Sequence, residues 1–196
     1  IFTLILLISS CNKGESNKSD TLSKIEEESF KFDERAIYKE LSEENLKKIP
    51  DDMLEPAILD YIDYQIQKNK FNLYETIKKL PHAFKVIYIT YCFDEKVSSS
   101  GFMGFFMSQE QIFIEDLPYA LKEIKAFNCE KVAKEALIIY NKYRDIFSSE
   151  NVEKSLMSKA ESELDRIDDI FYKTNEDLRQ LRKIYIKDHL KDFVTK

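Results

Sequence analysis

Glycine and proline are scarce in this chain, which contains 3 glycines and 4 prolines among its 196 residues. Sandwiches and barrels of many short strands need turn residues at frequent intervals, so the composition disfavours both architectures. Charged residues make up 34% of the chain and hydrophobic residues 43%, which is enough for a helical core of ordinary size. The chain is therefore predicted to be all-α, with a single globular multi-helix domain.

Cysteine is also scarce. The three cysteines, Cys11, Cys92 and Cys129, show no Cys-x-x-Cys spacing, so the sequence indicates neither a zinc site nor a dithiol redox centre. No metal and no other cofactor is predicted. Cys92 and Cys129 fall on or beside apolar helical faces, where buried free thiols are usual, although an oxidising compartment would allow a disulfide.

The sequence lacks a recognisable catalytic set. Ser98, Ser99 and Ser100 are the only suggestive nucleophiles, and the two histidines are His82 and His189. One histidine is expected at a helix start and the other in a polar stretch of the closing helix, where capping or surface roles are usual. We expect that the protein is not an enzyme and that the serine hydroxyls bond the local backbone.

A strong excess of one charge is absent, because 30 basic and 36 acidic residues leave a net charge of −6. Direct binding to nucleic acid needs a clustered basic surface, so we do not expect it. One group of acids is predicted to share a helix face, along which a four-residue step rises ~6 Å, comparable to the separation of neighbouring phosphates. Arg166 and Lys173 interrupt the group, and such strips are commonly solvated surface. The candidate acidic binding face consists of Glu161, Asp165, Asp168 and Asp169.

The apolar run over residues 1–8 is shorter than the ~20 residues that span a bilayer. It ends in Ser9-Ser10-Cys11, which resembles the lipobox of bacterial lipoproteins, with Ser10 where Gly or Ala is more common. The resemblance implies a signal over residues 1–11 and lipidation of Cys11, and the first residues of the gene product are then expected to be missing. Acyl chains make a durable anchor, so we expect a location at the bacterial cell envelope, or in the cytoplasm if the signal is false.

Residues 12–33 are polar and are predicted to form a flexible linker, followed by the helical domain over residues 34–196. Ser42 and Asn128 are expected to cap helices, and Thr174–Asp177 has a capping-box pattern that opens a helix to Phe193. No repeat of fixed period indicates a solenoid. Helical spacing of apolar residues predicts helices at about 37–49, 54–66, 73–80, 81–92, 117–127, 128–147, 152–171 and 174–193.

A glycine- and phenylalanine-rich stretch, Asp94–Met107, interrupts this helical pattern. Gly101 and Gly104 are two of the three glycines, and glycine serves where the backbone turns sharply. The stretch is predicted to form a tight corner fixed into the core. The corner residues are Val97, Gly101, Phe102, Phe105 and Phe106.

Two blocks of sequence resemble the DNA-mimic protein 19 family, and the likeness extends from about Leu54 to Val194. The first block is Lys96-Val97-Ser98-Ser99-Ser100-Gly101-Phe102-Met103-Gly104-Phe105-Phe106, where the family has Glu-Val-x-Asn-Gly-Gly-Phe-x-x-Phe-Phe. Lys96, Ser99 and Ser100 depart from that pattern, so no role of the family's Glu or Asn is carried over. The second block is Leu164-Asp165-Arg166-Ile167-Asp168-Asp169-Ile170-Phe171-Tyr172, followed by Glu176-Asp177-Leu178.

The resemblance implies an all-α fold and, from the member that named the family, an acidic surface that imitates DNA toward a DNA-binding protein. Two hypotheses follow. The first is a non-enzymatic, membrane-tethered helical module that binds a protein of unknown identity. The alternative is a cytoplasmic DNA mimic that acts through the acidic helix face. An exported domain cannot meet a cytoplasmic repressor, so the cellular location of the protein decides between the two hypotheses.

Overall fold

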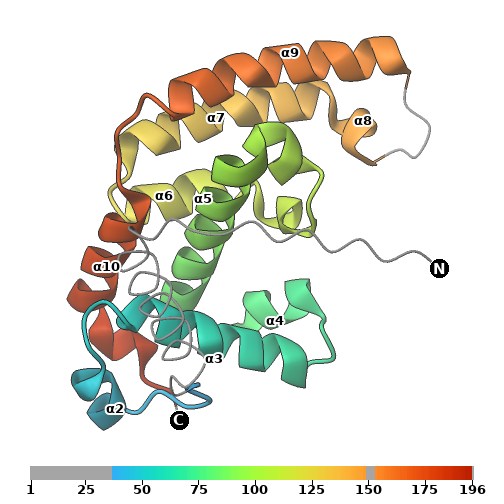
Figure 1. Cartoon of the computed structure of the whole chain (residues 1–196). Helices are drawn as coiled ribbons and strands as arrows, with labels where there is room; N and C mark the ends of the chain where they lie inside the picture. The colour runs from blue at the N-terminus through green and yellow to red at the C-terminus, as the bar shows by residue number, and fades with distance from the viewer. Residues whose placement is uncertain (1–36, 149–152, 196) are drawn as a thin grey trace, which may run out of the picture. The chain divides into compact units, whose positions relative to one another are not determined.

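The computed structural model describes residues 37–148 and 153–195. The predicted signal, Cys11 and the linker over residues 12–33 lie outside the described residues. Within the described part, all regular structure is helical and no strand occurs. These described residues belong to one compact unit. The predicted all-α fold with a single multi-helix domain is confirmed (Figure 1).

The helices follow one another with short connections. Their bounds are α2 Glu43–Lys48, α3 Leu54–Lys68, α4 Leu73–Lys79, α5 His82–Phe106, the 3-10 helix η1 Gln109–Phe113, α6 Leu117–Glu123, α7 Phe127–Lys142, α8 Arg144–Ser148, α9 Lys154–Phe171, α10 Leu178–Asp188 and the 3-10 helix η2 Leu190–Phe193. Local signals explain several starts. The Ser42 side chain accepts a hydrogen bond from the Asn45 N–H at 3.1 Å, and the Asn72 side chain accepts one from the Glu75 N–H at 3.2 Å.

Two predicted helix starts are wrong in detail. The N-cap of α7 is Ala126, so Asn128 lies inside the helix. The helix start is capped from a distance, because the Glu176 carboxylate accepts the N–H groups of Asn128 at 3.0 Å and Cys129 at 2.8 Å. The second start is that of α10, where the predicted capping box begins at Thr174 but the N-cap is Asp177. The Asp177 side chain accepts the Gln180 N–H at 2.9 Å.

The predicted closing helix is also shorter than expected. It ends at Asp188, and a separate 3-10 turn covers Leu190–Phe193. Helix α9 is continuous from Lys154 to Phe171, close to the predicted range of about 152–171.

Helix α5 is the centre of the core. It packs against α3, α6, α9 and α10. Figure 1 shows α9 near the C-terminal end of α5 and α3 near its N-terminal end. Around its C-terminal part, Phe93, Phe102 and Phe171 form an aromatic cluster with ring centroids 5.4–6.1 Å apart. This packing fixes α9, which carries the candidate acidic face, against α5.

Candidate functional site

Helix α5 is kinked at Gly101. This residue has φ 65° and ψ −177°, a conformation that glycine adopts without the steric cost that a side chain incurs. Gly104, the other glycine of the predicted corner, lies in the helical turn after the kink. The remaining corner residues are buried, each with at most 1% exposure: Val97, Phe102, Phe105 and Phe106.

A side chain of α9 and that of its C-cap residue bond the backbone at the kink. The Phe102 N–H donates to Asp168 Oδ1 at 2.8 Å, and the Tyr172 hydroxyl donates to the Val97 carbonyl at 2.9 Å. A kink takes backbone groups away from their helical partners, and buried groups of this kind need replacements. Asp168 and Tyr172 are four residues apart and therefore share a face of α9. The two blocks that carry the family resemblance are thus in direct contact.

The position of Asp168 corrects the expected acidic face. A Cβ built on Gly101 would lie 2.3 Å from Asp168 Oδ2, so the carboxylate is turned against α5. Burial raises the pKa of Asp168, and the charges of Asp165 and Asp169 add to this, while the Phe102 N–H acts in the opposite direction. Asp168 is a structural residue of the kink.

The other three members of the predicted face, Glu161, Asp165 and Asp169, are exposed. They recur every fourth residue along α9, so they form a row on one side of the helix. None of them has an ion-pair partner within residues 37–148 and 153–195. We call Glu161, Asp165 and Asp169 the acidic face.

The nearby Glu163 does not belong to this row. Its Oε1 accepts a hydrogen bond from Lys142 at 2.5 Å and from the Tyr143 hydroxyl at 2.7 Å. These contacts lower the pKa of Glu163, with the Lys142 hydrogen bond as the largest cause. Glu163 therefore joins α9 to α7.

The two histidines occupy unrelated positions. His82 Nε2 lies 3.8 Å from Glu123, near the start of α5. His189 Nδ1 lies 2.9 Å from the carbonyl oxygen of Tyr185, at the end of α10. His189 therefore makes a local contact within its own helix end, whereas His82 contacts α6.

The three serines lie on α5, just before the kink. The Ser98 hydroxyl lies 3.4 Å from Asp94 Oδ1, and the Ser99 hydroxyl donates to the Lys96 carbonyl at 3.1 Å. Ser99 and Ser100 share a contact of 3.1 Å. The sequence predicted that all three hydroxyls bond the local backbone. Of the three, only the Ser99 hydroxyl does so.

Cys92 and Cys129 are both buried and both free. The disulfide that the sequence left open is therefore not formed. Burial raises the pKa of each thiol to about 12. At neutral pH the thiolate form, which acts as the nucleophile, is scarce at both positions.

A buried ionic cluster around Arg182 could not be foreseen from the sequence. Arg182 of α10 is 2% exposed and forms an ion pair with Glu55 of α3. Its Nη1 and Nη2 both lie 3.0 Å from Asp94 Oδ2, and Nη1 also donates to the Thr90 carbonyl at 3.3 Å. The one available signal is that Arg182 shares the face of α10 that carries the buried residues Leu178, Tyr185 and Ile186. We call Arg182, Glu55 and Asp94 the buried ionic cluster.

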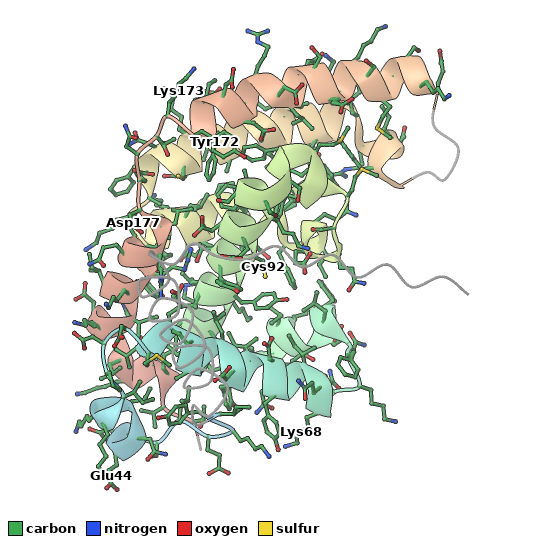
Figure 2. The ribbon with its side chains drawn as sticks, in the orientation of Figure 1. Glu44, Lys68, Cys92, Tyr172, Lys173 and Asp177 are labelled. Carbon is green, nitrogen blue, oxygen red and sulfur yellow. The ribbon has the colours of Figure 1, made fainter. Side chains whose placement is uncertain are left out.

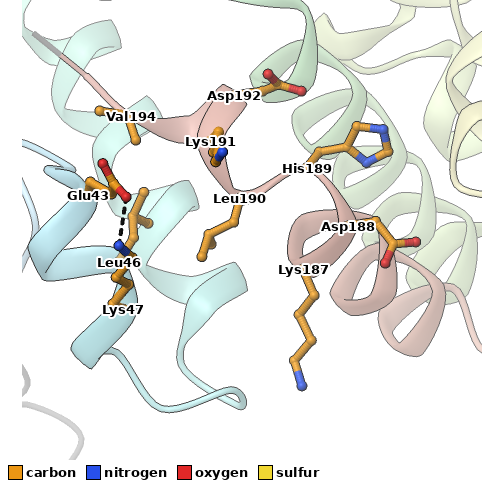
Figure 3. A pocket seen from close by; sticks show the side chains of 10 residues that line it. All are labelled: Glu43, Leu46, Lys47, Lys187, Asp188, His189, Leu190, Lys191, Asp192 and Val194. Atoms are coloured by element: carbon orange, nitrogen blue, oxygen red, sulfur yellow. Dashed lines mark hydrogen bonds and ion pairs between the residues drawn. The ribbon is translucent and has the colours of Figure 1, made fainter.

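A cavity of about 470 Å³ lies between α2 and the end of α10 (Figure 3). Its walls carry charges of both signs, and the Glu43–Lys47 pair in it has a separation of 2.6 Å. Lys187 forms an ion pair with Asp51. The side chains that line the cavity are acidic, basic and apolar, so they do not indicate one class of ligand. Among the described residues, no cluster of three or more His, Cys, Asp or Glu side chains is placed to hold a metal ion.

The family model for "DMP19-like protein" matches residues 78–189, which is more than half of the chain. The chain therefore belongs to the DMP19-like family. The matched segment contains the kink and all of α9 and α10. No curated protein and no solved structure matches the chain. Among the described helices, none combines the length and apolar character that a bilayer-spanning segment needs.

Proposed function

We propose that this domain is a non-enzymatic binding module whose acidic face contacts a positively charged surface of another protein. The observation that carries the proposal is the row of exposed, unpaired carboxylates on α9, Glu161, Asp165 and Asp169. The helix that presents them is fixed to α5 through Asp168 and Tyr172. A row on a rigid element keeps its geometry and loses little conformational entropy on binding.

The use of the other ionisable groups supports a non-catalytic role. Arg182 and Glu55 are engaged in the buried ionic cluster, and Glu176 caps α7. The thiols of Cys92 and Cys129 have pKa values raised to about 12. A general base or nucleophile needs a pKa near the working pH, so the two thiols fit structural roles better than catalytic ones.

A membrane tether at the bacterial cell envelope is the second part of the proposal. It is supported by the apolar residues 1–8 and the lipobox-like ending at Cys11. Changing Cys11 to Ser in the full gene product is expected to move the protein from the membrane fraction to the soluble fraction. Unchanged retention in the membrane fraction would remove this part of the proposal.

DNA mimicry is the alternative, favoured by membership of the DMP19-like family and by the four-residue spacing of the acidic face. A step of four residues along a helix rises ~6 Å, which is comparable to the distance between neighbouring phosphates. The inward position of Asp168 leaves three acids in the row. A mimic would also have to meet its partner in the cytoplasm, which a lipid anchor outside the cytoplasm prevents.

The test is capture of partners from the native cell with the full chain and with a triple variant, Glu161→Gln, Asp165→Asn and Asp169→Asn. A matched control changes the same number of exposed acids on other helices: Glu43→Gln, Glu44→Gln and Glu135→Gln. The proposal expects the triple variant to lose the partner and the control to retain it. Equal capture by all three proteins would refute the acidic face as the binding surface.

The same experiment separates the two hypotheses. A captured DNA-binding protein that duplex DNA displaces, and that dissociates steeply with salt, would establish mimicry. A captured envelope protein that duplex DNA does not displace would establish the tethered module.

A further inference from the structure

The turn between α3 and α4 carries a surface that the proposed function does not use. Residues 64–80 contain four lysines and one glutamate, in a chain whose net charge is −6. All four lysines are exposed, as are two aromatic side chains of the same segment. We call this surface the basic turn, and it consists of Lys68, Lys70, Phe71, Tyr74, Lys78 and Lys79.

Phe71 projects from the basic turn in an unusual backbone conformation. The φ angles of Lys70 and Phe71 are 55° and 61°, in the left-handed region that bulky residues rarely occupy. The Phe71 N–H donates to the Ile66 carbonyl at 2.9 Å, and the Lys70 N–H donates to the Gln67 carbonyl at 3.1 Å. The result is a phenylalanine with 74% of its surface exposed.

Hydrogen bonds on both sides of Phe71 hold this conformation. The Asn69 side chain donates to the Thr76 hydroxyl at 2.9 Å, which links the end of α3 to α4. Asn72 caps α4 by accepting the Glu75 N–H at 3.2 Å. Strained residues that the surroundings hold in place are concentrated at functional sites, so an exposed aromatic ring held in this way requires an explanation.

We propose that the basic turn docks on an anionic lipid surface. Phe71 would enter the interface between headgroups and acyl chains, and the lysines would contact headgroup phosphates. Lysines around an exposed aromatic residue are typical of segments that bind membrane surfaces. Charge complementarity supports a lipid ligand, since the only ion pair of these lysines within the described residues joins Lys79 to Glu75 at 3.8 Å. The inference goes beyond the proposed function, because it assigns a second surface and a different class of ligand.

The path of the chain is consistent with this docking. The described residues begin at Ile37, and Lys39 lines the same cavity, of about 550 Å³, as Tyr64 and Lys68. The Lys39 ammonium lies 5.6 Å from the centre of the Tyr64 ring. The first described residues of the domain therefore lie beside Lys68 of the basic turn.

Docking in this way also leaves the acidic face accessible. Figure 2 shows Lys68 near one end of the domain and Tyr172, at the end of α9, near the other. A membrane bound at the basic turn would face away from α9. One surface would thus contact lipid while the other contacts a protein.

The test uses tryptophan as a probe, because the sequence contains no tryptophan. Phe71→Trp places a single probe in the basic turn of the full chain. Ile138→Trp on α7 is the matched control, since Ile138 is 71% exposed and Phe71 is 74% exposed. Both proteins are mixed with vesicles of phosphatidylglycerol and phosphatidylcholine, or of phosphatidylcholine alone, with and without a spin-labelled quenching lipid.

The Phe71→Trp probe is expected to shift to shorter emission wavelength and to be quenched in the anionic vesicles only. The Ile138→Trp probe is expected to respond in neither. This control also corrects for attachment through residues 1–8 or an anchor, which would bring both probes to the vesicle equally. Equal responses of the two probes, or no response of Phe71→Trp in anionic vesicles, would overturn the proposal.

Charge reversal tests the lysines. Changing Lys68, Lys70 and Lys78 to Glu in the Phe71→Trp protein is expected to lower its partition onto anionic vesicles by about a hundredfold, at about fivefold for each lysine removed. The matched control reverses three exposed lysines elsewhere: Lys131, Lys154 and Lys159. Equal loss in both sets would overturn the assignment to the basic turn.

Two further arms identify the ligand and separate this proposal from the previous one. A response of Phe71→Trp to duplex DNA or polyglutamate, at concentrations where anionic vesicles give none, would reassign the surface. Adding Cys11→Ser tests the tether alone. If the emission of the Phe71→Trp probe in that protein still shifts in anionic vesicles, the basic turn docks without the tether. Loss of partner capture without loss of the probe response would come from the acidic face.

Discussion

The kink and the basic turn are two of the places where the domain uses positive φ, and they do so in opposite ways. At the kink of α5, Gly101 has φ 65° and is buried, and a Cβ there would lie 2.3 Å from Asp168. At the basic turn, Lys70 and Phe71 have φ 55° and 61°, and both side chains are exposed. The kink needs a residue without a side chain, because α9 packs directly on it. The turn accepts backbone strain, and its side chains project into solvent.

The two parts also differ in their relation to the family. The matched segment, residues 78–189, contains the kink and both of its partners on α9. Most of the basic turn, from Lys68 to Tyr74, precedes that segment. The kink thus lies within the family segment of this chain, and most of the basic turn lies before it.

The strongest test of this comparison is Gly101→Val. Backbone strain of up to roughly 3 kcal/mol and overpacking of similar size should together lower the free energy of unfolding by about 5 kcal/mol. Urea denaturation followed by circular dichroism measures the loss. Ser99→Val, at an exposed position on the same helix, is the control and should change stability little. A Gly101→Val protein as stable as the parent would mean that the kink tolerates a side chain.

Arg182 connects the helices that carry the two regions, since it joins α10 to α3 and α5. Arg182→Ala leaves Glu55 buried without its partner, so we expect a loss of roughly 3–5 kcal/mol in the free energy of unfolding. Arg179→Ala is the control, because Arg179 is exposed and lies 3.8 Å from Glu55, and its loss should be below about 1 kcal/mol. Similar losses in both variants, again measured by urea denaturation, would contradict a structural role for the buried cluster.

Lys70→Gly should raise the stability of the domain, whereas Gly101→Val at the kink should lower it. Relief of left-handed strain, about 1–2 kcal/mol, exceeds the entropy that glycine adds to the unfolded chain, about 0.5–1 kcal/mol. The thermal midpoint should therefore rise slightly. Lys68→Gly, at the last residue of α3, should instead lower it slightly, because glycine is a poorer helix former than lysine. A fall for Lys70→Gly would show that contacts of the lysine outweigh its backbone strain.

The smallest effect concerns pH. Burial raises the pKa of Asp168 above its ordinary value of 3.8, so the folded domain holds this proton more tightly than the unfolded chain does. The stabilising contribution is present at low pH and is lost as the pH rises through the folded pKa. Asp168→Asn keeps an acceptor for the Phe102 N–H without titrating. Its stability relative to the parent should rise between pH 4 and pH 7, as urea midpoints would measure, and a constant difference would contradict the raised pKa.

The sequence predicted the helical fold well, because helix formation leaves periodic and local signals. Ser42 and the Asn72–Pro81 interval mark helix limits within a few residues of where they occur. The glycine at the kink was likewise visible, since the surrounding phenylalanines made its position unusual. These signals depend on residues that are near one another in the chain.

The partners of these residues could not be predicted. Asp168 bonds Phe102 across 66 positions, and Arg182 bonds Glu55 across 127. As a result, Asp168 was expected on the acidic face, and Arg182 was not recognised as buried. Glu176 was similarly assigned to its own helix rather than to α7.

The sequence alone determined that the chain is all-α, that its helices have apolar faces and that the backbone turns near Gly101. Each of these follows from local propensity and spacing. Only the tertiary structure decided which carboxylates remain on the surface: Asp168 is turned inward, whereas Glu161, Asp165 and Asp169 stay exposed. The reason is that the kink leaves backbone groups without helical hydrogen-bond partners, and a nearby polar side chain can replace those partners. Which side chain does so depends on how α9 packs against α5.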